Sequence, residues 1–249
     1  MRKYKILLYV YQIWVWLVYI PSLLISTLFC GSFTILMQVI ISPKVGSYFS
    51  NFWGTWNIIM TPSLINSAFS NKIDKKQSYV LVANHQSQYD IFVLFHKVSG
   101  QKIFVQKKEL SKVPFFGWAT RNMGNISVDR SNPEIARKAV QEATKNIPRG
   151  ARVIFFAEGT RGMSDTLGEF KKGAFHFALD AKLPILPVSI IGTRNILPDQ
   201  SFRLFPGRAK VICHDPIDTS TYSKDTIDDL ISKTKNIIQQ GIQSHSNKA

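Results

Sequence analysis

The sequence predicts an α/β fold, in which helices flank a mostly parallel central sheet, preceded by an N-terminal hydrophobic helical hairpin in a membrane. The first observation is that residues 6–42 contain no charged side chain, which ordinary amphipathic helices do not allow over such a length. The second is that, beyond residue 71, short apolar runs alternate with helical stretches, as in parallel sheets. We therefore expect a membrane-anchoring helical segment at residues 1–70 and an α/β domain at residues 71–249.

The uncharged N-terminal run is expected to bend. A straight helix of that length would rise ~55 Å, against a hydrocarbon core of ~30 Å. Pro21 and Gly31 are the candidate break points, which would leave helices at residues 6–20 and 23–41. Basic residues flank both ends, so the positive-inside rule keeps both ends on the cytoplasmic side, as in a hairpin or re-entrant pair. A single span is the alternative, and a cleaved signal peptide is disfavoured because no small-x-small cleavage pattern follows.

Charge and cysteine content narrow the classes of function. The 249 residues include 31 Lys and Arg against 16 Asp and Glu, a formal net charge of +15. We therefore expect anionic partners: nucleic acid, phospholipid head groups or phosphorylated substrates. The two cysteines, Cys30 and Cys213, lie inside apolar stretches, which excludes a disulfide-built secreted domain and a cysteine-cluster zinc site.

The elements of the α/β domain follow from periodicity and from helix start signals. Strands are expected at residues 79–83, 103–105, 125–128, 152–156, 185–191 and 209–213. Several are apolar throughout, as strands covered on both faces must be. Helices are expected after Asp90 and at residues 133–147, 173–181 and 226–242, and Ser131-Asn132-Pro133-Glu134 is a start signal for one of them. Functional loops in such folds leave the carboxyl ends of the strands.

The first polar loop follows the strand expected at residues 79–83. Asp90 comes five positions after His85, across a strand-to-helix turn. At that spacing the carboxylate can accept a hydrogen bond from one ring nitrogen and leave the other nitrogen free as a base. The alternative is a turn in which the two residues have no chemical role and Asp90 caps the next helix. A zinc site is disfavoured, because His85 has no third ligand at the usual spacing.

The second polar loop is Glu158-Gly159-Thr160-Arg161-Gly162, after the strand expected at residues 152–156. Its glycines let backbone N–H groups approach a ligand, Thr160 adds a hydroxyl group, and Arg161 can fork two hydrogen bonds onto a phosphate. We therefore expect an anion site. It is not a Walker loop, because no Gly-Lys-Ser/Thr sequence occurs.

A third region could add positive charge near the same anion. It contributes Lys107 and Lys108 after one expected strand and Arg130 after another. Taken by themselves, these three residues would be ordinary surface cations, so their assignment depends on the other two loops.

Four motifs together resemble those of a known family. In order, they are Asn84-His85 with Asp90, Gly124-x-Ile126-x-Val128-Asp129-Arg130, Phe156-Ala157-Glu158-Gly159-Thr160-Arg161, and Leu186-Pro187-Val188. They resemble the motifs of the glycerolipid acyltransferases, most closely those of the 1-acylglycerol-3-phosphate O-acyltransferases, also called lysophosphatidic acid acyltransferases. Each motif alone is weak, but four in this order over residues 75–215 are specific.

The resemblance implies acyl transfer from acyl-CoA or acyl carrier protein to the sn-2 hydroxyl of lysophosphatidic acid, which gives phosphatidic acid in phospholipid biosynthesis. It implies that His85 is the general base and Asp90 the carboxylate that orients it. It assigns the binding of the substrate phosphate to the basic and glycine-rich positions Lys107, Arg130, Glu158, Gly159, Thr160 and Arg161. No metal and no cofactor besides the acyl donor are implied.

The implied partners are membrane phospholipids, lysophosphatidic acid and the acyl donor, with the catalytic domain on the cytoplasmic face of the membrane. A nucleic-acid binder is disfavoured because aromatic residues are not interleaved with Lys and Arg. Two alternatives stay open: an acyltransferase of the same family acting on another lysophospholipid or on glycerol 3-phosphate, and a non-catalytic lipid-binding protein. Gly162, where the family often has Ser, and Gln88-Tyr89 before Asp90 leave the acceptor and acyl preferences open.

Overall fold

The structure is a computed structural model, and it describes residues 2–129, 131, 133–162, 166–201 and 203–246. The chain folds into two compact units, which are described separately. The first unit comprises Met1–Asn66, Gln86–Val98 and Ile191–Val211, and the second comprises Ser67–His85, Ser99–Ile190 and Ile212–Ala249. The domain division expected between residues 70 and 71 stays a prediction.

One continuous helix begins the first unit. α1 (Arg2–Trp14), the π-helical η1 (Val15–Tyr19) and α2 (Ile20–Ile40) follow one another directly, so the break expected at Pro21 or Gly31 is wrong. The Ile20 N–H bonds to the Val15 carbonyl, one residue further back than in an α-helix. This wider turn lies immediately before Pro21 and accommodates the proline ring and its missing N–H. Gly31 costs only about 1 kcal/mol relative to alanine, too little to end a helix.

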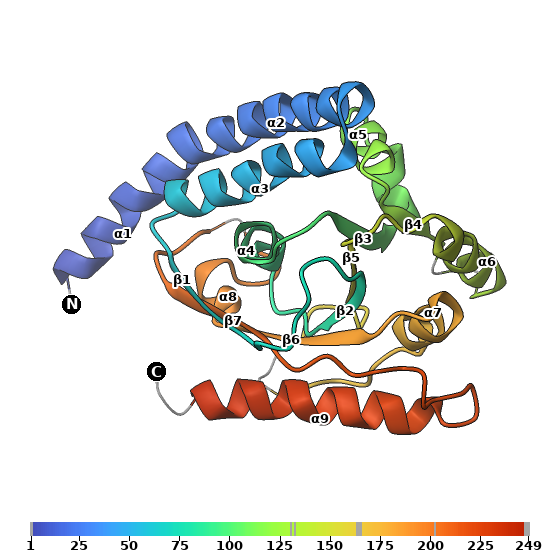
Figure 1. The fold of residues 1–249 in the computed structure, drawn as a ribbon. Helices are drawn as coiled ribbons and strands as arrows, with labels where there is room; N and C mark the ends of the chain where they lie inside the picture. The colour runs from blue at the N-terminus through green and yellow to red at the C-terminus, as the bar shows by residue number, and fades with distance from the viewer. Residues whose placement is uncertain (1, 130, 132, 163–165, 202, 247–249) are drawn as a thin grey trace. The chain divides into compact units, whose positions relative to one another are not determined.

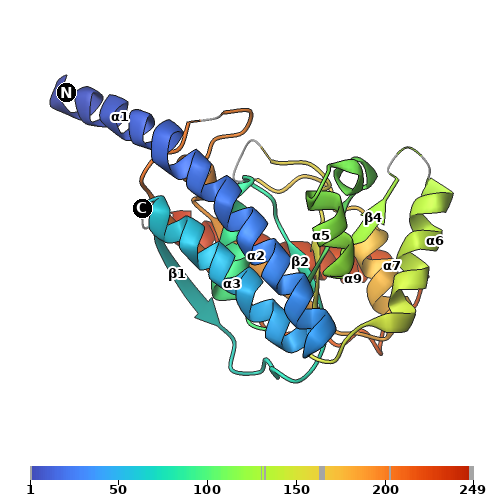
Figure 2. The same ribbon diagram turned by 90° about the horizontal axis from the view of Figure 1, so that it is seen from above.

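The chain reverses direction after α2, not within it. Ser42 begins α3 (Pro43–Met60), and its hydroxyl accepts a hydrogen bond from the Val45 N–H at 3.3 Å, the usual capping geometry. α2 and α3 lie side by side, as Figure 2 shows. The Trp53 and Trp56 indoles on α3 donate hydrogen bonds to hydroxyl groups of α2 at 3.0 and 2.9 Å. The helical hairpin is therefore built from α2 and α3.

The next helix of the first unit packs on α3. α4 (Tyr89–Lys97) contacts it through aromatic rings, with the Trp53 ring centroid 5.0 Å from that of Phe92 and 5.6 Å from that of Phe95. A Cβ atom added at Gly54 would lie 2.4 Å from the Phe95 Cβ, so the close approach of the two helices requires glycine. The short α8 (Thr193–Ile196) contacts α4.

Within the described residues, seven strands form one sheet in the order β1-β7-β6-β2-β5-β3-β4. The β2–β5, β2–β6, β3–β5 and β3–β4 pairs are all parallel, so the predicted α/β fold with a mostly parallel sheet is confirmed. The strands are β1 (Leu64–Phe69), β2 (Tyr79–Ala83), β3 (Lys102–Lys107), β4 (Ile126–Val128), β5 (Arg152–Phe156), β6 (Ile185–Ile191) and β7 (Arg208–Cys213). The sequence does not predict β1, because only Ile65 of its six residues is buried.

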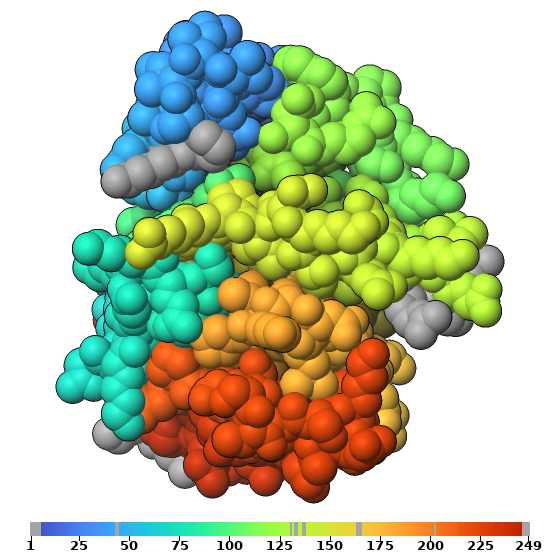
Figure 3. Space-filling view, turned by 45° about the vertical axis from the view of Figure 1, so that its right-hand side comes forward, coloured from blue at the N-terminus to red at the C-terminus, as the bar shows by residue number. Residues whose placement is uncertain are grey.

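Helices of the second unit cover the sheet. They are the 3₁₀ turn η2 (Lys108–Lys112), α5 (Phe116–Asn122), α6 (Pro133–Ala143) with the 3₁₀ turn η3 (Thr144–Asn146), α7 (Gly173–Ala181) and α9 (Ile227–Ser246). α6 and α7 contact each other, as their neighbouring surfaces in Figure 3 show, and α7 lies beside α9 (Figure 1). The sequence predicts α6, α7 and α9 within a few residues but not η2 and α5, whose Pro-Phe-Phe-Gly-Trp run has no clear helical period.

Two cations are buried at the amino ends of neighbouring strands in the second unit. Lys102 on β3 pairs in register with Arg152 on β5, and both are almost fully buried. The Arg152 guanidinium donates to the Gln77 carbonyl at 2.6 Å and to the Gly150 carbonyl at 3.0 Å, and the Lys102 ammonium donates to the Gly100 carbonyl at 3.1 Å. Burial, and then the nearby Arg152 charge, lower the pKa of Lys102 to about 7.

Candidate active site

The register of the parallel strands brings three predicted site residues to one edge of the sheet. β5 lies between β2 and β3. Ala83 at the end of β2 is level with Phe156 at the end of β5, and β3 runs parallel to β5 and ends at Lys107. His85 and Glu158 each follow their strand by two residues. The carboxyl ends of parallel strands are the usual place for a binding site in this fold class.

The backbone of His85 is held from both sides within the second unit. Its N–H donates to a Glu158 carboxylate oxygen at 3.2 Å, and its carbonyl accepts a hydrogen bond from the Gly162 N–H at 2.8 Å. The imidazole ring stacks on the Phe156 ring, with centroids 3.9 Å apart and planes 17° from parallel. These contacts fix the position and the plane of the imidazole before any substrate binds.

Glu158 organises this edge through backbone N–H groups. Only 8% of the residue is exposed. One carboxylate oxygen accepts from His85, and the other accepts from the Gly168 N–H at 3.0 Å. Because each oxygen has a backbone donor, the carboxylate ties the strand end at His85 to the loop after β5. The sequence contains a signal for this role, an acidic residue in a basic, glycine-rich loop, but it does not identify the partners.

Two glycines of the loop after β5 make room for that carboxylate. A Cβ atom added at Gly162 would lie 3.1 Å from a Glu158 oxygen, and one added at Gly168 would lie 3.3 Å from the same oxygen. Such distances are tighter than ordinary carbon contacts, so side chains there would displace the carboxylate. Gly162, a departure from the residue that the family often has, thus has a local structural reason in this chain.

The predicted anion-binding residues lie on the same loop. Gly159 has φ +73°, a left-handed conformation that glycine adopts without cost. Thr160 is exposed and Arg161 is partly exposed. Arg161 directly precedes Gly162, whose N–H bonds to His85. The loop of the predicted phosphate site is therefore in direct backbone contact with the predicted base.

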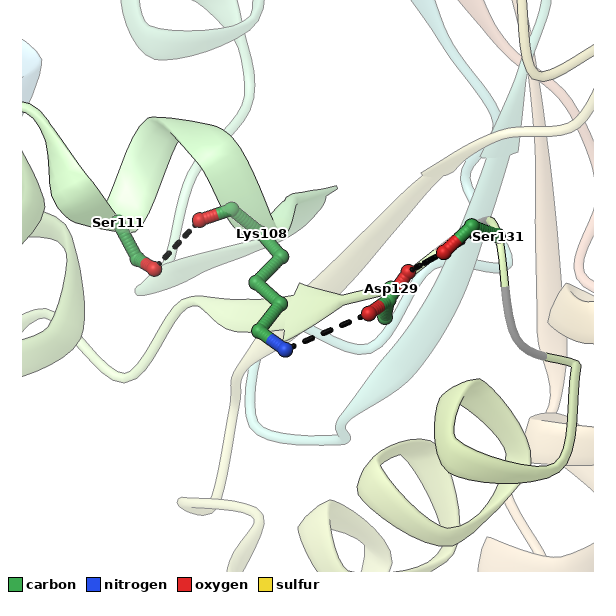
Figure 4. A network of polar contacts seen from close by, with 4 residues as sticks. All are labelled: Lys108, Ser111, Asp129 and Ser131. Carbon is green, nitrogen blue, oxygen red and sulfur yellow. Dashed lines mark hydrogen bonds and ion pairs between the residues drawn. The ribbon is translucent and has the colours of Figure 1, made fainter.

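Lys107 and its neighbour lie at the end of β3. Both Lys107 and Lys108 are exposed. The Lys108 ammonium is 3.3 Å from an Asp129 carboxylate oxygen, and the other oxygen accepts from the Ser131 hydroxyl at 2.5 Å (Figure 4). Hydrogen bonds from Ser131 and Lys108 hold the pKa of Asp129 below its usual value. Arg130, the other predicted phosphate ligand in this region, lies outside the described residues.

Asn84 has a role that the sequence does not reveal. It is buried, its amide NH₂ donates to the Ile190 carbonyl at 2.8 Å, and its side-chain oxygen accepts from the Ile190 N–H at 2.7 Å. The side chain thus imitates a paired strand and joins the end of β2 to β6. The fourth motif, Leu186-Pro187-Val188, lies on β6 itself and pairs with β2, so it supports the strand that precedes His85.

Asp90 belongs to the first unit, in the first turn of α4. The residue is fully buried, and one carboxylate oxygen accepts from the Gln86 and Ser87 N–H groups at 2.8 and 3.1 Å. Ser87 in turn donates its hydroxyl hydrogen bond to the Leu197 carbonyl at 2.6 Å. An ionised carboxylate at a helix N-terminus is a favourable arrangement. The predicted hydrogen bond between Asp90 and the His85 ring stays a prediction.

The described part of the chain offers no cluster for a metal ion. Among those residues, no three His, Cys, Asp or Glu side chains gather where they could hold one. What the carboxyl ends of these strands in the second unit do offer is an imidazole held in place beside a loop that carries the Thr160 hydroxyl and the Arg161 guanidinium. Such a set can accept a proton and bind an anion.

Comparisons with known proteins agree with this chemistry. The family model for the acyltransferases matches residues 65–191. A 1-acyl-sn-glycerol-3-phosphate acyltransferase of Haemophilus influenzae is 36% identical over 177 residues, which are 68% of this chain and 71% of that protein. The match to a chloroplastic enzyme of the same name from Brassica napus is 37% identical over 139 residues, 55% of this chain but only 40% of that protein.

A solved structure extends the likeness to the whole chain. The 1-acyl-sn-glycerophosphate (LPA) acyltransferase PlsC from Thermotoga maritima superposes with a TM-score of 0.77 and 25% identity, over 99% of this chain and 98% of that one. The family match also contains β2, β3 and β5, whose carboxyl ends hold His85, Lys107 and Glu158. The chain therefore belongs to the acyltransferase family.

Proposed function

We propose that the protein transfers a fatty acyl group from a thioester donor to the sn-2 hydroxyl of lysophosphatidic acid and so forms phosphatidic acid. The observation that carries the proposal is the 2.8 Å hydrogen bond between the Gly162 N–H and the His85 carbonyl. It keeps the loop of Arg161 against the residue that would act as base. The names of the relatives, 1-acyl-sn-glycerol-3-phosphate acyltransferases, support the same reaction.

In the proposed mechanism the substrate hydroxyl is the nucleophile. One ring nitrogen of the His85 imidazole takes the proton of the sn-2 hydroxyl as the oxygen attacks the thioester carbonyl carbon. The tetrahedral intermediate collapses, the carbon–sulfur bond breaks, and the donor thiolate leaves and takes the proton from His85, which restores the base. Asp90 is proposed to orient the imidazole and to stabilise its protonated form.

The acceptor phosphate is proposed to bind to the loop after β5. Arg161 supplies a planar pair of donors and Thr160 a hydroxyl, which match the oxygens of a phosphate group. The Gly159 N–H donates to the Phe156 carbonyl at 3.0 Å, so the proposed contribution of Gly159 is the left-handed turn that lets the phosphate approach the loop. Lys107 and Arg130 are proposed to add charge to the same site. The contacts of Glu158 with the backbone of residues 85 and 168 support a role in holding the site in place, alongside its predicted place in the phosphate site.

The acyl donor and the membrane contact are further parts of the proposal. Acyl-CoA and acyl carrier protein both fit the chemistry, and no other cofactor is required. The helix Ile6–Ile40 is long and apolar enough to cross a membrane, and only 17% of its most apolar stretch of 18 residues is buried inside the structure. This exposure supports membrane attachment. The cytoplasmic location of the catalytic residues is proposed from the basic residues that flank the apolar run.

One assay tests the reaction and its acceptor. Purified full-length protein in detergent or vesicles would be given radiolabelled acyl-CoA or acyl carrier protein, with lysophosphatidic acid, glycerol 3-phosphate and a second lysophospholipid offered in parallel. We expect labelled phosphatidic acid from lysophosphatidic acid alone. Labelled product from another acceptor instead would move the protein to a different reaction of the family. Binding of lysophosphatidic acid without any transfer from either donor would indicate a lipid-binding protein.

A further inference from the structure

The second unit exposes large apolar side chains mainly in one place. Over its described residues, those that are exposed are Phe69, Leu110, Val113, Trp118 and Ile135. Leu110, Val113 and Trp118, which are 41%, 46% and 48% exposed, lie within nine residues of one another. Single exposed apolar residues are normal, but a group of three including tryptophan calls for an explanation.

The local fold holds these three side chains in one compact turn. η2 packs against α5, and the Val113 N–H bonds to the Leu110 carbonyl at 3.3 Å. The Gly117 N–H bonds to the Val113 carbonyl at 2.8 Å. A Cβ atom added at Gly117 would lie only 2.0 Å from the Ser111 carbonyl oxygen. Glycine therefore permits the close approach of the two segments.

The turn is also fixed to the sheet beneath it. The Gln106 amide on β3 donates to the Thr120 hydroxyl on α5 at 3.0 Å. At the other end, Lys108 contacts Asp129 after β4, and the Ser111 hydroxyl donates to the Lys108 carbonyl at 2.6 Å (Figure 4). The exposed apolar side chains thus project from a supported platform.

Basic side chains lie in the same segment as the apolar group. Residues 107–122 contain Lys107, Lys108, Lys112 and Arg121 against Glu109, so four positive charges and one negative charge give +3. All five charged residues are exposed. Tryptophan and aliphatic side chains beside Lys and Arg are the composition of segments that lie at a membrane surface with anionic lipids.

We propose that residues 107–122 of the second unit form a further membrane-contact surface, in addition to the apolar N-terminal helix, that docks on anionic phospholipid. Leu110, Val113 and Trp118 enter the head-group region, and Lys112 and Arg121 contact lipid phosphates. The surface begins at Lys107, which ends β3 at the edge of the sheet that holds His85. Docking there would bring that edge next to the bilayer, where a lysolipid acceptor resides.

A fluorescent label tests the docking without any catalytic readout. Val113→Cys and the control Ile135→Cys, which replaces a residue of similar exposure (49%) on α6, would each be labelled with an environment-sensitive fluorophore in the full-length protein. The native Cys30 and Cys213 are both buried, and burial raises the pKa of Cys213 to about 12, so it resists labelling. Both variants would be reconstituted in phosphatidylglycerol–phosphatidylcholine vesicles with and without a lipid-borne quencher.

The expected result is a blue-shifted emission at position 113 that the lipid quencher lowers several-fold, with water-like emission at position 135. Replacing both Lys112 and Arg121 with Gln should lower the ratio of docked to undocked label by about 30-fold. Each cation is expected to change this ratio by roughly fivefold, and the two factors multiply. Water-like emission at position 113 would overturn the proposal. Equal docking on vesicles of pure phosphatidylcholine would also overturn it. So would shielding of the label from water that depends on protein concentration and not on lipid, because that result would indicate contact with a second copy of the chain.

Discussion

The two ends of β2, β5 and β3 bury side chains of opposite charge. At the carboxyl ends, the buried Glu158 carboxylate accepts hydrogen bonds from backbone N–H groups. At the amino ends, the buried Arg152 and Lys102 donate to backbone carbonyls. The difference follows from chain direction, because helices that connect parallel strands begin at the carboxyl ends of the strands with unpaired N–H groups and end near the amino ends with unpaired carbonyls. One end is thereby suited to anions, including a substrate phosphate, and the other to structural cations.

The largest effect is expected at the carboxyl end from His85→Ala. Loss of a general base should lower kcat for acyl transfer by about 10²–10⁴-fold, while binding to lipid vesicles is unchanged. His176→Ala, on α7, is the matched control and should retain activity. Initial rates with lysophosphatidic acid measure the effect, and a variant with activity near the wild-type rate would remove His85 from the mechanism.

Glu158→Gln should have the next largest effect. An amide keeps one acceptor oxygen but turns an NH₂ group toward a backbone N–H, so one of the bonds to His85 or Gly168 is lost. Misplacement of the base by this change should lower kcat by roughly 10–100-fold and leave the KM for the acyl donor within about twofold. The exposed Glu169→Gln is the control on the same loop. Equal rates for the two variants would show that Glu158 does not position His85.

Arg161→Lys should affect the acceptor and not the donor. A lysine keeps the charge but loses the planar pair of donors, so the KM for lysophosphatidic acid should rise by about 10-fold or more. Arg149→Lys, before the amino end of β5, is the control and should change neither KM. A parallel rise in both KM values for Arg161→Lys would contradict selective phosphate binding.

The smallest effect on activity is expected from Lys102→Met at the amino end. Lys102 has a folded-state pKa of about 7, below its unfolded value, so its protonation destabilises the fold, fully so below pH 7. The wild-type free energy of unfolding should therefore rise relative to the variant between pH 7 and about 10.5, by a few kcal/mol in total. Denaturant unfolding from pH 6 to 10 measures this, and a constant difference would contradict the buried charge.

The sequence predicts much of this arrangement, because the strands and the loops that follow them differ in local polarity. β2, β5 and β6 are mostly apolar and buried over nearly their whole length, and polar loops follow them. The strands and the carboxyl ends with His85 and Arg161 therefore follow from the sequence pattern. The edge strand β1 and the η2–α5 turn are not predictable in this way, since their residues are mostly exposed and have no clear period.

The contacts that support the site cannot be predicted from the sequence for another reason. Glu158 with Gly168, and Asn84 with Ile190, join residues that are 10 and 106 positions apart, and the motifs give residue types but not partners. The continuous helix through Pro21 is a similar case. A proline predicts a break in a helix unless the turn before it widens, and no local sequence pattern predicts the π-helical geometry of η1.

In the proposed mechanism, one lysophosphatidic acid molecule contacts His85 and Arg161 together at the carboxyl ends of the strands. A structure of the wild-type protein with lysophosphatidic acid and no acyl donor tests it most directly. The predicted result is a phosphate bound to residues 159–161 with the sn-2 oxygen within about 2.6–3.2 Å of a His85 ring nitrogen. A phosphate bound at the amino ends, near Lys102 and Arg152, or an sn-2 oxygen out of reach of His85, would contradict it.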